Sequence, residues 1–121
     1  LGGLHGNTTS SALKTDVDEF IFSIGGTQVK SSSALVVGDW YHVVGTRSGT
    51  TMTLYINSIS EGGTATSSQT VTNALSKRIG ADSSDDRFYA DQIDDVRIYS
   101  DALSATEVTK NYNAGLSKHR N

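Results

Sequence analysis

The chain has 121 residues, a formal net charge of −3 and no cysteine, and this length suffices for one hydrophobic core and therefore for one domain. The acidic balance and the lack of a long basic cluster exclude a typical nucleic-acid-binding surface, and no apolar stretch approaches the roughly 20 residues of a membrane-spanning helix. The absence of cysteine excludes disulfides and thiolate metal sites.

Small and β-branched polar residues dominate the composition. Apolar residues make up 36% of the chain, and 17 serines, 14 threonines and 12 glycines take their place. This usage favours an antiparallel sandwich with one solvated face on each sheet over a helical bundle. A disordered Ser/Thr tract is the alternative, and recurring strand patterns argue against it for most of the chain.

The first half of the chain predicts two hairpins. Residues 1–18 show no sustained period, which indicates a loop or a single weak strand. Residues 19–24 alternate, with Phe20, Phe22 and Ile24 on one face, and the glycines at 25 and 26 supply a tight turn into a partner strand over 27–30. The second hairpin spans residues 40–46 and 51–56. We expect Trp40 in the core, because it begins that alternation.

The second half predicts more strands and one helix. Residues 60–74 indicate a long surface loop with one short strand, 75–79 a strand, and 88–99 one long strand or two with a bulge. Ser104 and Glu107 form a capping box at the start of a helix. Val108 and Tyr112 share a face of that helix, and Gly115 is placed to end it in the left-handed conformation.

Three segments together resemble a known family: Asp-Trp-Tyr-His-Val-Val-Gly-Thr at 39–46, Met-Thr-Leu-Tyr-Ile-Asn at 52–57, and Ile-Asp-Asp-Val-Arg-Ile-Tyr at 93–99 leading into the capped helix. In order and spacing they resemble the laminin-G-like jelly roll of the concanavalin A-like lectin/glucanase superfamily, over about residues 35–116. Two positions differ from the usual family pattern. Ser58 stands where the family usually has glycine, and Ala90-Asp91 stands where it usually has a small residue and a glycine before the Ile-Asp pair.

The resemblance implies an all-β, antiparallel two-sheet jelly-roll sandwich with one short C-terminal helix, as a single domain over residues 1–121. Family members generally carry one or two further strands before the position of Leu1, so one interpretation is that N-terminal strands of the family are lacking. In that case one sheet edge is open, and an open edge invites self-association or docking on a neighbouring domain.

The same fold serves glycan-binding modules and glycosidases. The family's glucanases place carboxylates at i, i+2 and i+4 of one strand, because alternation then puts all three on one face. Here the 91/93/95 face carries Asp91, Ile93 and Asp95, and the other face carries only Asp94. We therefore expect no catalytic residues and no enzyme activity.

Asp94 and Asp95 remain to be explained. On a strand, Asp94 would share a face with apolar residues and be partly buried, and Asp95 would share a face with Arg97 as a partner. A structural polar pair is the simpler interpretation, and a role toward a ligand or ion is the alternative. His42 is expected to be a core or semi-buried histidine with its hydrogen bonds satisfied.

The loop around residues 82–89 is the candidate ligand-binding site, since it combines clustered carboxylates, a guanidinium and an aromatic ring: Asp82, Asp85, Asp86, Arg87 and Tyr89. Carboxylates there can accept hydrogen bonds from sugar hydroxyls or coordinate calcium, and Tyr89 can stack on a sugar ring. The segment does not match the EF-hand pattern, so a solvated turn is the alternative and the metal is undetermined.

We therefore expect a non-catalytic carbohydrate-binding or adhesion module of a larger extracellular, cell-surface or virion-surface protein. Its partner is a glycan or a neighbouring protein domain, without nucleic acid and without membrane insertion. The alternative from another class is a structural or assembly domain without a ligand. A glycoside hydrolase is the interpretation that the sequence favours least.

Overall fold

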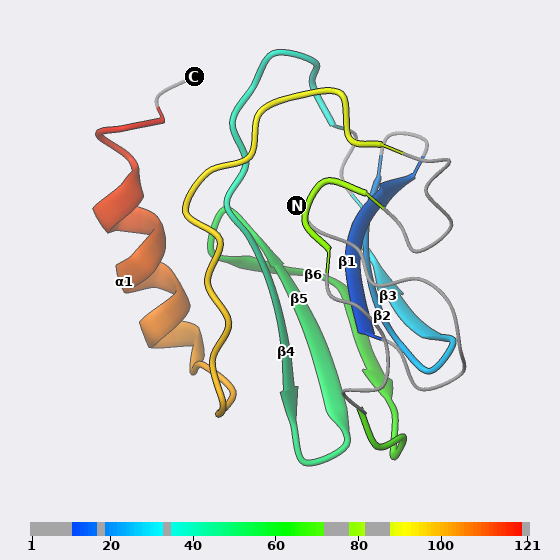
Figure 1. Cartoon of the computed structure of the whole chain (residues 1–121). Coiled ribbons are helices and arrows are strands. Elements are labelled where there is room, and N and C mark those ends of the chain that lie inside the picture. Colours follow the sequence, from blue (N-terminus) through cyan, green and yellow to red (C-terminus); the bar gives the residue numbers. More distant parts are fainter. Residues whose placement is uncertain (1–10, 17–18, 33–34, 72–77, 82–87, 120–121) are drawn as a thin grey trace.

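A computed structural model describes residues 11–16, 19–32, 35–71, 78–81 and 88–119. It contains two antiparallel three-stranded sheets, in the orders β1-β2-β3 and β4-β5-β6, and one C-terminal helix, α1 (Figure 1). The bounds are β1 Ser11–Asp16, β2 Glu19–Ile24, β3 Thr27–Lys30, β4 Val43–Ser48, β5 Thr51–Ile56, β6 Ile59–Thr66 and α1 Ala105–Gly115. The expected all-β sandwich with a C-terminal helix is confirmed. No helix in the described ranges has the length and apolar character needed to span a membrane.

The first sheet forms as the alternation predicts. β2 and β3 pair through a turn in which Gly25 and Gly26 have φ angles of 57° and 85°, a conformation that glycine adopts without a steric penalty. β1 pairs with the other edge of β2, and it lies within the region for which a loop or one weak strand is expected.

The second sheet is a meander of three strands. β4 and β5 pair up to Ser48 and Thr51, and β5 turns into β6 through Asn57 and Ser58, whose φ angles are 49° and 69°. Both central residues of this turn are thus left-handed, and Ser58 holds a conformation that suits the glycine usual in the family. The short strand predicted within the surface loop over 60–74 is present as β6, and it is longer than predicted, because it extends to Thr66.

The core lies between the two sheets and combines the inward faces of β2, β3 and β5: Phe20, Phe22, Ile24, Val29, Met52, Leu54 and Ile56. Leu54 and Ile56 are buried as predicted. Gly45 of β4 allows the sheets to approach, since a Cβ atom there would meet the ring of Phe22 at 2.7 Å.

The two sheets close against each other along β3 and β6. A Cβ atom on Gly62 would collide with the backbone carbonyl of Lys30. The two strands can therefore approach this closely only because residue 62 is glycine. The backbone N–H of Ser32 donates to the Glu61 carboxylate at 3.1 Å. Gly62 and Gly63 lie in the register shift of β6 opposite Thr53/Leu54, where a bulge bends the strand toward its neighbour.

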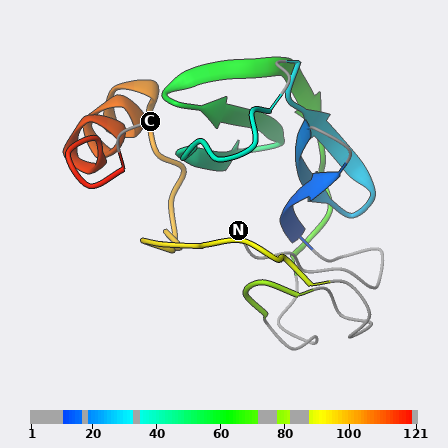
Figure 2. The same ribbon diagram turned by 90° about the horizontal axis from the view of Figure 1, so that it is seen from above.

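Residues 88–99 do not form the predicted strand. Within the described ranges their ladder contact is one isolated bridge, between Ala81 and Phe88, and the segment then runs extended to α1, with its first part away from both sheets (Figure 2). The predicted burial of Val96 and Ile98 is wrong, because 47% and 89% of their surfaces are exposed. No strand in the described part of the chain covers them, and alternation buries a side chain only when the segment joins a sheet.

Helix α1 begins as predicted. The hydroxyl of Ser104 accepts from the backbone N–H of Glu107 at 3.2 Å, and the Glu107 carboxylate accepts from the N–H of Ser104 at 3.1 Å, which is a complete capping box. Val108 is fully buried. The predicted left-handed end at Gly115 is wrong: Leu116 continues in the right-handed conformation, and a further turn leads to His119.

Candidate functional site

Of the five predicted ligand-binding residues, the structure describes Tyr89. The other four lie outside the described residues: Asp82, Asp85, Asp86 and Arg87. The backbone N–H of Tyr89 donates to the carbonyl of Gly80 at 2.8 Å, beside the bridge between Ala81 and Phe88. Phe88 and Tyr89 are 69% and 37% exposed. Two aromatic side chains are therefore held at the surface by paired backbone.

Beyond these rings opens a hollow of about 1220 Å³. Its walls come from β2, from β4 with the residues before it, from residues 89–103 and from the last turns of α1. Its volume exceeds the roughly 300–1,000 Å³ of most small-molecule pockets, so it is larger than one small ligand requires.

Polar groups follow the aromatic rings along the rim of this hollow. Asp91 and Gln92, two and three positions after Tyr89, are exposed, and the backbone N–H of Gln92 donates to the Asp91 carboxylate at 2.8 Å. Burial raises the pKa of the Tyr89 hydroxyl, and the charge of Asp91 raises it further. The phenol therefore stays protonated at neutral pH and can donate a hydrogen bond, while the carboxylate and the amide accept.

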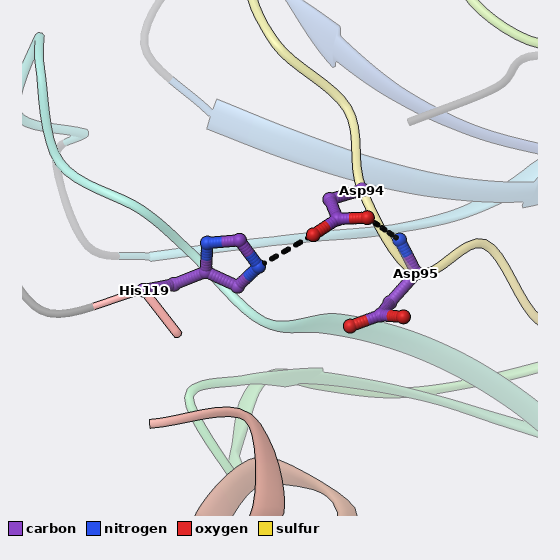
Figure 3. Close-up of side chains that lie close together, drawn as sticks. All are labelled: Asp94, Asp95 and His119. Atoms are coloured by element: carbon purple, nitrogen blue, oxygen red, sulfur yellow. Dashed lines mark hydrogen bonds and ion pairs between the residues drawn. The ribbon is translucent and has the colours of Figure 1, made fainter. Parts of the chain in front are cut away.

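Asp94 and Asp95 are placed differently from the prediction. Asp94 is exposed rather than partly buried, because residues 91–99 join no sheet. Its carboxylate meets the Nε2 atom of His119 at 2.9 Å (Figure 3). The carboxylate of Asp95 pairs with Lys118 at 3.5 Å. The C-terminal turn after α1 thus supplies a basic partner for each of the two carboxylates.

The pKa of Asp94 is lowered, chiefly because its carboxylate accepts the backbone N–H of Asp95. Burial opposes this effect and is the second-largest cause, while the hydrogen bond from His119 and the positive charges of Lys118 and His119 lower the pKa further. The expected Asp95–Arg97 interaction contributes only as a charge, since Tyr99 is the main cause of the raised pKa of Arg97. The carboxylate of Asp94 is therefore stabilised in its ionised form.

Trp40 belongs to the cluster formed by Asp94, Asp95, Lys118 and His119. The prediction that it lies in the core is wrong. It is half-buried, and its ring stacks on the imidazole of His119 with centroids 4.1 Å apart. This contact could not be predicted from the sequence, because 79 positions separate the two residues and no pattern relates them. The contact forms because α1 returns along residues 94–103 and brings the end of the chain beside the start of β4.

Asp94, Asp95 and His119 are also the described residues that could hold a metal ion, with ligand atoms within 4.8 Å of one another. Calcium prefers oxygen ligands, and an imidazole nitrogen does not suit it. Lys118 and His119 already partner both carboxylates. The arrangement is explained by ion pairing, and calcium remains an expectation tied to residues 82–87.

His42 is semi-buried, as predicted, but its hydrogen bonds are not all satisfied. Its backbone N–H donates to the Asn57 side chain at 2.9 Å, whereas its Nδ1 atom is buried with no hydrogen-bond partner among the described residues. Burial lowers the pKa of the imidazole, and the nearby charge of Arg97 lowers it further. His42 is therefore neutral at pH 7.

Comparison with known proteins agrees with this fold. A family profile described as the concanavalin A-like lectin/glucanases superfamily matches residues 4–109. A crystal structure of residues 221–444 of an S-layer domain-containing protein from Clostridium thermocellum is similar, with 32% sequence identity and a TM-score of 0.49. The match covers 88% of this chain and 58% of that one. The comparison with curated proteins gave no match.

Proposed function

Because this chain belongs to the concanavalin A-like lectin/glucanase superfamily, we propose that it is a non-catalytic carbohydrate-binding or adhesion module of a larger extracellular or virion-surface protein. The observation that carries the proposal is the exposed aromatic pair Phe88 and Tyr89, fixed by backbone pairing and followed after one residue by Asp91 and Gln92. Family membership supplies the fold, and these four residues supply the binding chemistry.

The chemistry of these side chains suits a sugar ring. A pyranose presents an apolar face, which an aromatic ring can cover, and hydroxyl groups at its edge, which carboxylates and amides can bind. Tyr89 offers a face together with a protonated hydroxyl, and Asp91 and Gln92 offer acceptors and a donor within three positions. Loops on a rigid scaffold are where recognition residues usually lie.

Two features support a role without catalysis. A retaining glycosidase needs an acid whose pKa is raised, near a second carboxylate about 5–5.5 Å away. Asp94 lies close to Asp95, but its pKa is lowered rather than raised, so it is poorly suited to donate a proton. The φ angle of Asp95 is 52°, which interrupts the alternation that aligns catalytic carboxylates on one face of a strand.

Binding to a glycan panel tests this proposal. We expect wild-type protein to bind at least one glycan, Tyr89→Ala to lose most of that affinity, and Tyr89→Phe to retain the stacking part of it. Tyr55→Ala is the matched control, because Tyr55 lies on β5 away from this rim. Binding that is equal in wild type and Tyr89→Ala would place the site elsewhere, and the release of reducing sugar would contradict a non-catalytic role.

A second candidate function is assembly with another polypeptide. It is favoured by a separate observation, the edge of β4, which no strand within the described ranges covers. Uncovered edges present backbone donors and acceptors that readily pair with another strand.

A further inference from the structure

Strand β4 exposes a row of backbone groups along the hollow. The N–H of Asn57 donates to the carbonyl of His42 at 2.8 Å, and antiparallel pairs alternate between bonded and non-bonded. Every second residue from His42 therefore bonds to β5. Val43, Gly45 and Arg47 point their N–H and C=O groups the other way, where they have no backbone partner among the described residues.

The opposite wall of the hollow is equally unpaired. Residues 93–103 form neither helix nor strand, and the backbone of Asp95 is left-handed, with a φ of 52°. Within the described part of the chain they make no backbone–backbone hydrogen bond, and Val96 and Ile98 remain exposed. Two segments whose backbone groups lack a backbone partner among the described residues thus face one hollow.

The two walls run in the same direction (Figure 1). Trp40, just before β4, and Asp94, near the start of the other wall, both contact His119. Further along the walls, His42 and Tyr99 contact adjacent residues of α1. Since every strand pair in this fold is antiparallel, one strand running the opposite way between the walls would continue that pattern on both sides.

The side chains around the hollow define what such a strand would carry. Phe20 and Phe22 line it from the first sheet, so inward side chains should be apolar. Asp39 and Asp91 line the end where β4 begins, and neither forms an ion pair with a described residue. A strand antiparallel to β4 ends there, so a basic residue near its C-terminus complements these carboxylates.

We propose that this hollow receives an extended β-strand from outside these 121 residues, antiparallel to β4, apolar at alternate positions and basic near its C-terminal end. This is strand addition at a sheet edge, in which main-chain hydrogen bonds give affinity and alternate side chains give specificity. The inference rests on the second candidate function, assembly, and is independent of glycan binding at Tyr89.

Amide hydrogen exchange of the whole chain tests the proposal. The probe is a nine-residue peptide of alternating valine and threonine with two lysines at its C-terminal end. We expect it to slow exchange at Val43, Gly45 and Arg47 by roughly tenfold or more. A peptide ending in two glutamates should protect them less, and one with a central proline should not protect them, because proline lacks the N–H that a ladder needs.

Two variants locate the effect. Val43→Pro removes one outward N–H without removing a bond to β5, so it should weaken peptide binding while exchange within β5 stays slow. If that variant does not fold, Asp39→Asn replaces it, and it should reduce the preference for lysine over glutamate. Both variants leave Tyr89 and Asp91 in place, so loss of glycan binding and loss of strand binding can be told apart.

Failure of all the peptides to change exchange in β4 overturns the proposal. Protection that rises with protein concentration in the absence of peptide also overturns it, because the occupant is then a second copy of this chain. Protection by a glycan in place of a peptide would assign the hollow to the sugar.

Discussion

The two sides of the β4-β5-β6 sheet are built in opposite ways. On the β6 side, Gly62 lets the strand approach the backbone of Lys30 so closely that no side chain fits. On the β4 side, a hollow of about 1220 Å³ separates the strand edge from residues 93–103. Alternation in sequence therefore produces burial only where a neighbouring strand is present. On the open side, which is the β4 side, the contacts come from single side chains.

Replacing Gly62 should have the largest effect, because it breaks the closed side. We expect Gly62→Ala to reduce the free energy of unfolding by about 3 kcal/mol or more, since the added methyl group would collide with backbone that cannot move alone. Denaturant unfolding measures this. Gly63→Ala is the matched control: its φ is similarly positive, at 70°, but nothing lies within 4 Å, so only about 1–2 kcal/mol of backbone strain is expected. Equal losses in both variants would show that the close approach contributes nothing.

Removing the cap of α1 probes the open side. Ser104→Ala should cost about 0.5–2 kcal/mol, because the N–H of Glu107 loses its acceptor. Thermal unfolding followed by circular dichroism gives the value, with Ser117→Ala, exposed after the helix, as the control. A midpoint unchanged by Ser104→Ala means that the helix does not contribute to the cooperative unit.

Ser58→Gly should instead stabilise the second sheet, by about 0.5–1 kcal/mol. Ser58 has a φ of 69°, and glycine adopts this conformation without the steric penalty of a Cβ atom. Ser60→Gly on β6 is the control and should be neutral or destabilising, because glycine weakens a strand. A loss of stability in Ser58→Gly would contradict the left-handed turn.

Acid should release the contacts that bridge the open side, with the smallest effect on global stability. The folded pKa of Asp94 is lowered, so its contribution is present above the pKa of the unfolded chain, about 3.9, and is lost as the pH falls through the folded value. Fluorescence of Trp40, the single tryptophan, should change below about pH 4 in wild type. Asp94→Asn should lack this change, and an identical titration in both proteins would exclude Asp94 as the cause.

Sequence patterns predicted the paired strands well and the unpaired segment badly. Leu54 and Ile56 are buried because β5 lies between two partners. Val96 and Ile98 show the same alternation, but their burial depends on a neighbouring strand that local sequence does not specify. The capping box at Ser104 was predictable because it is local. The stacking of Trp40 on His119 depends on how α1 packs, which no short pattern encodes.

Amide exchange along β4 in the isolated chain tests the central claim, that its outer edge is unpaired, most directly. We expect the exchange rate to alternate from residue to residue along β4. Exchange should be slow at Val44 and Thr46, whose backbone N–H groups face β5, and fast at Val43, Gly45 and Arg47, whose backbone N–H groups face the hollow. β5 should show no such alternation, because it has a partner on each side. Uniformly slow exchange along β4 in dilute protein would contradict the account, since the edge would then already be covered.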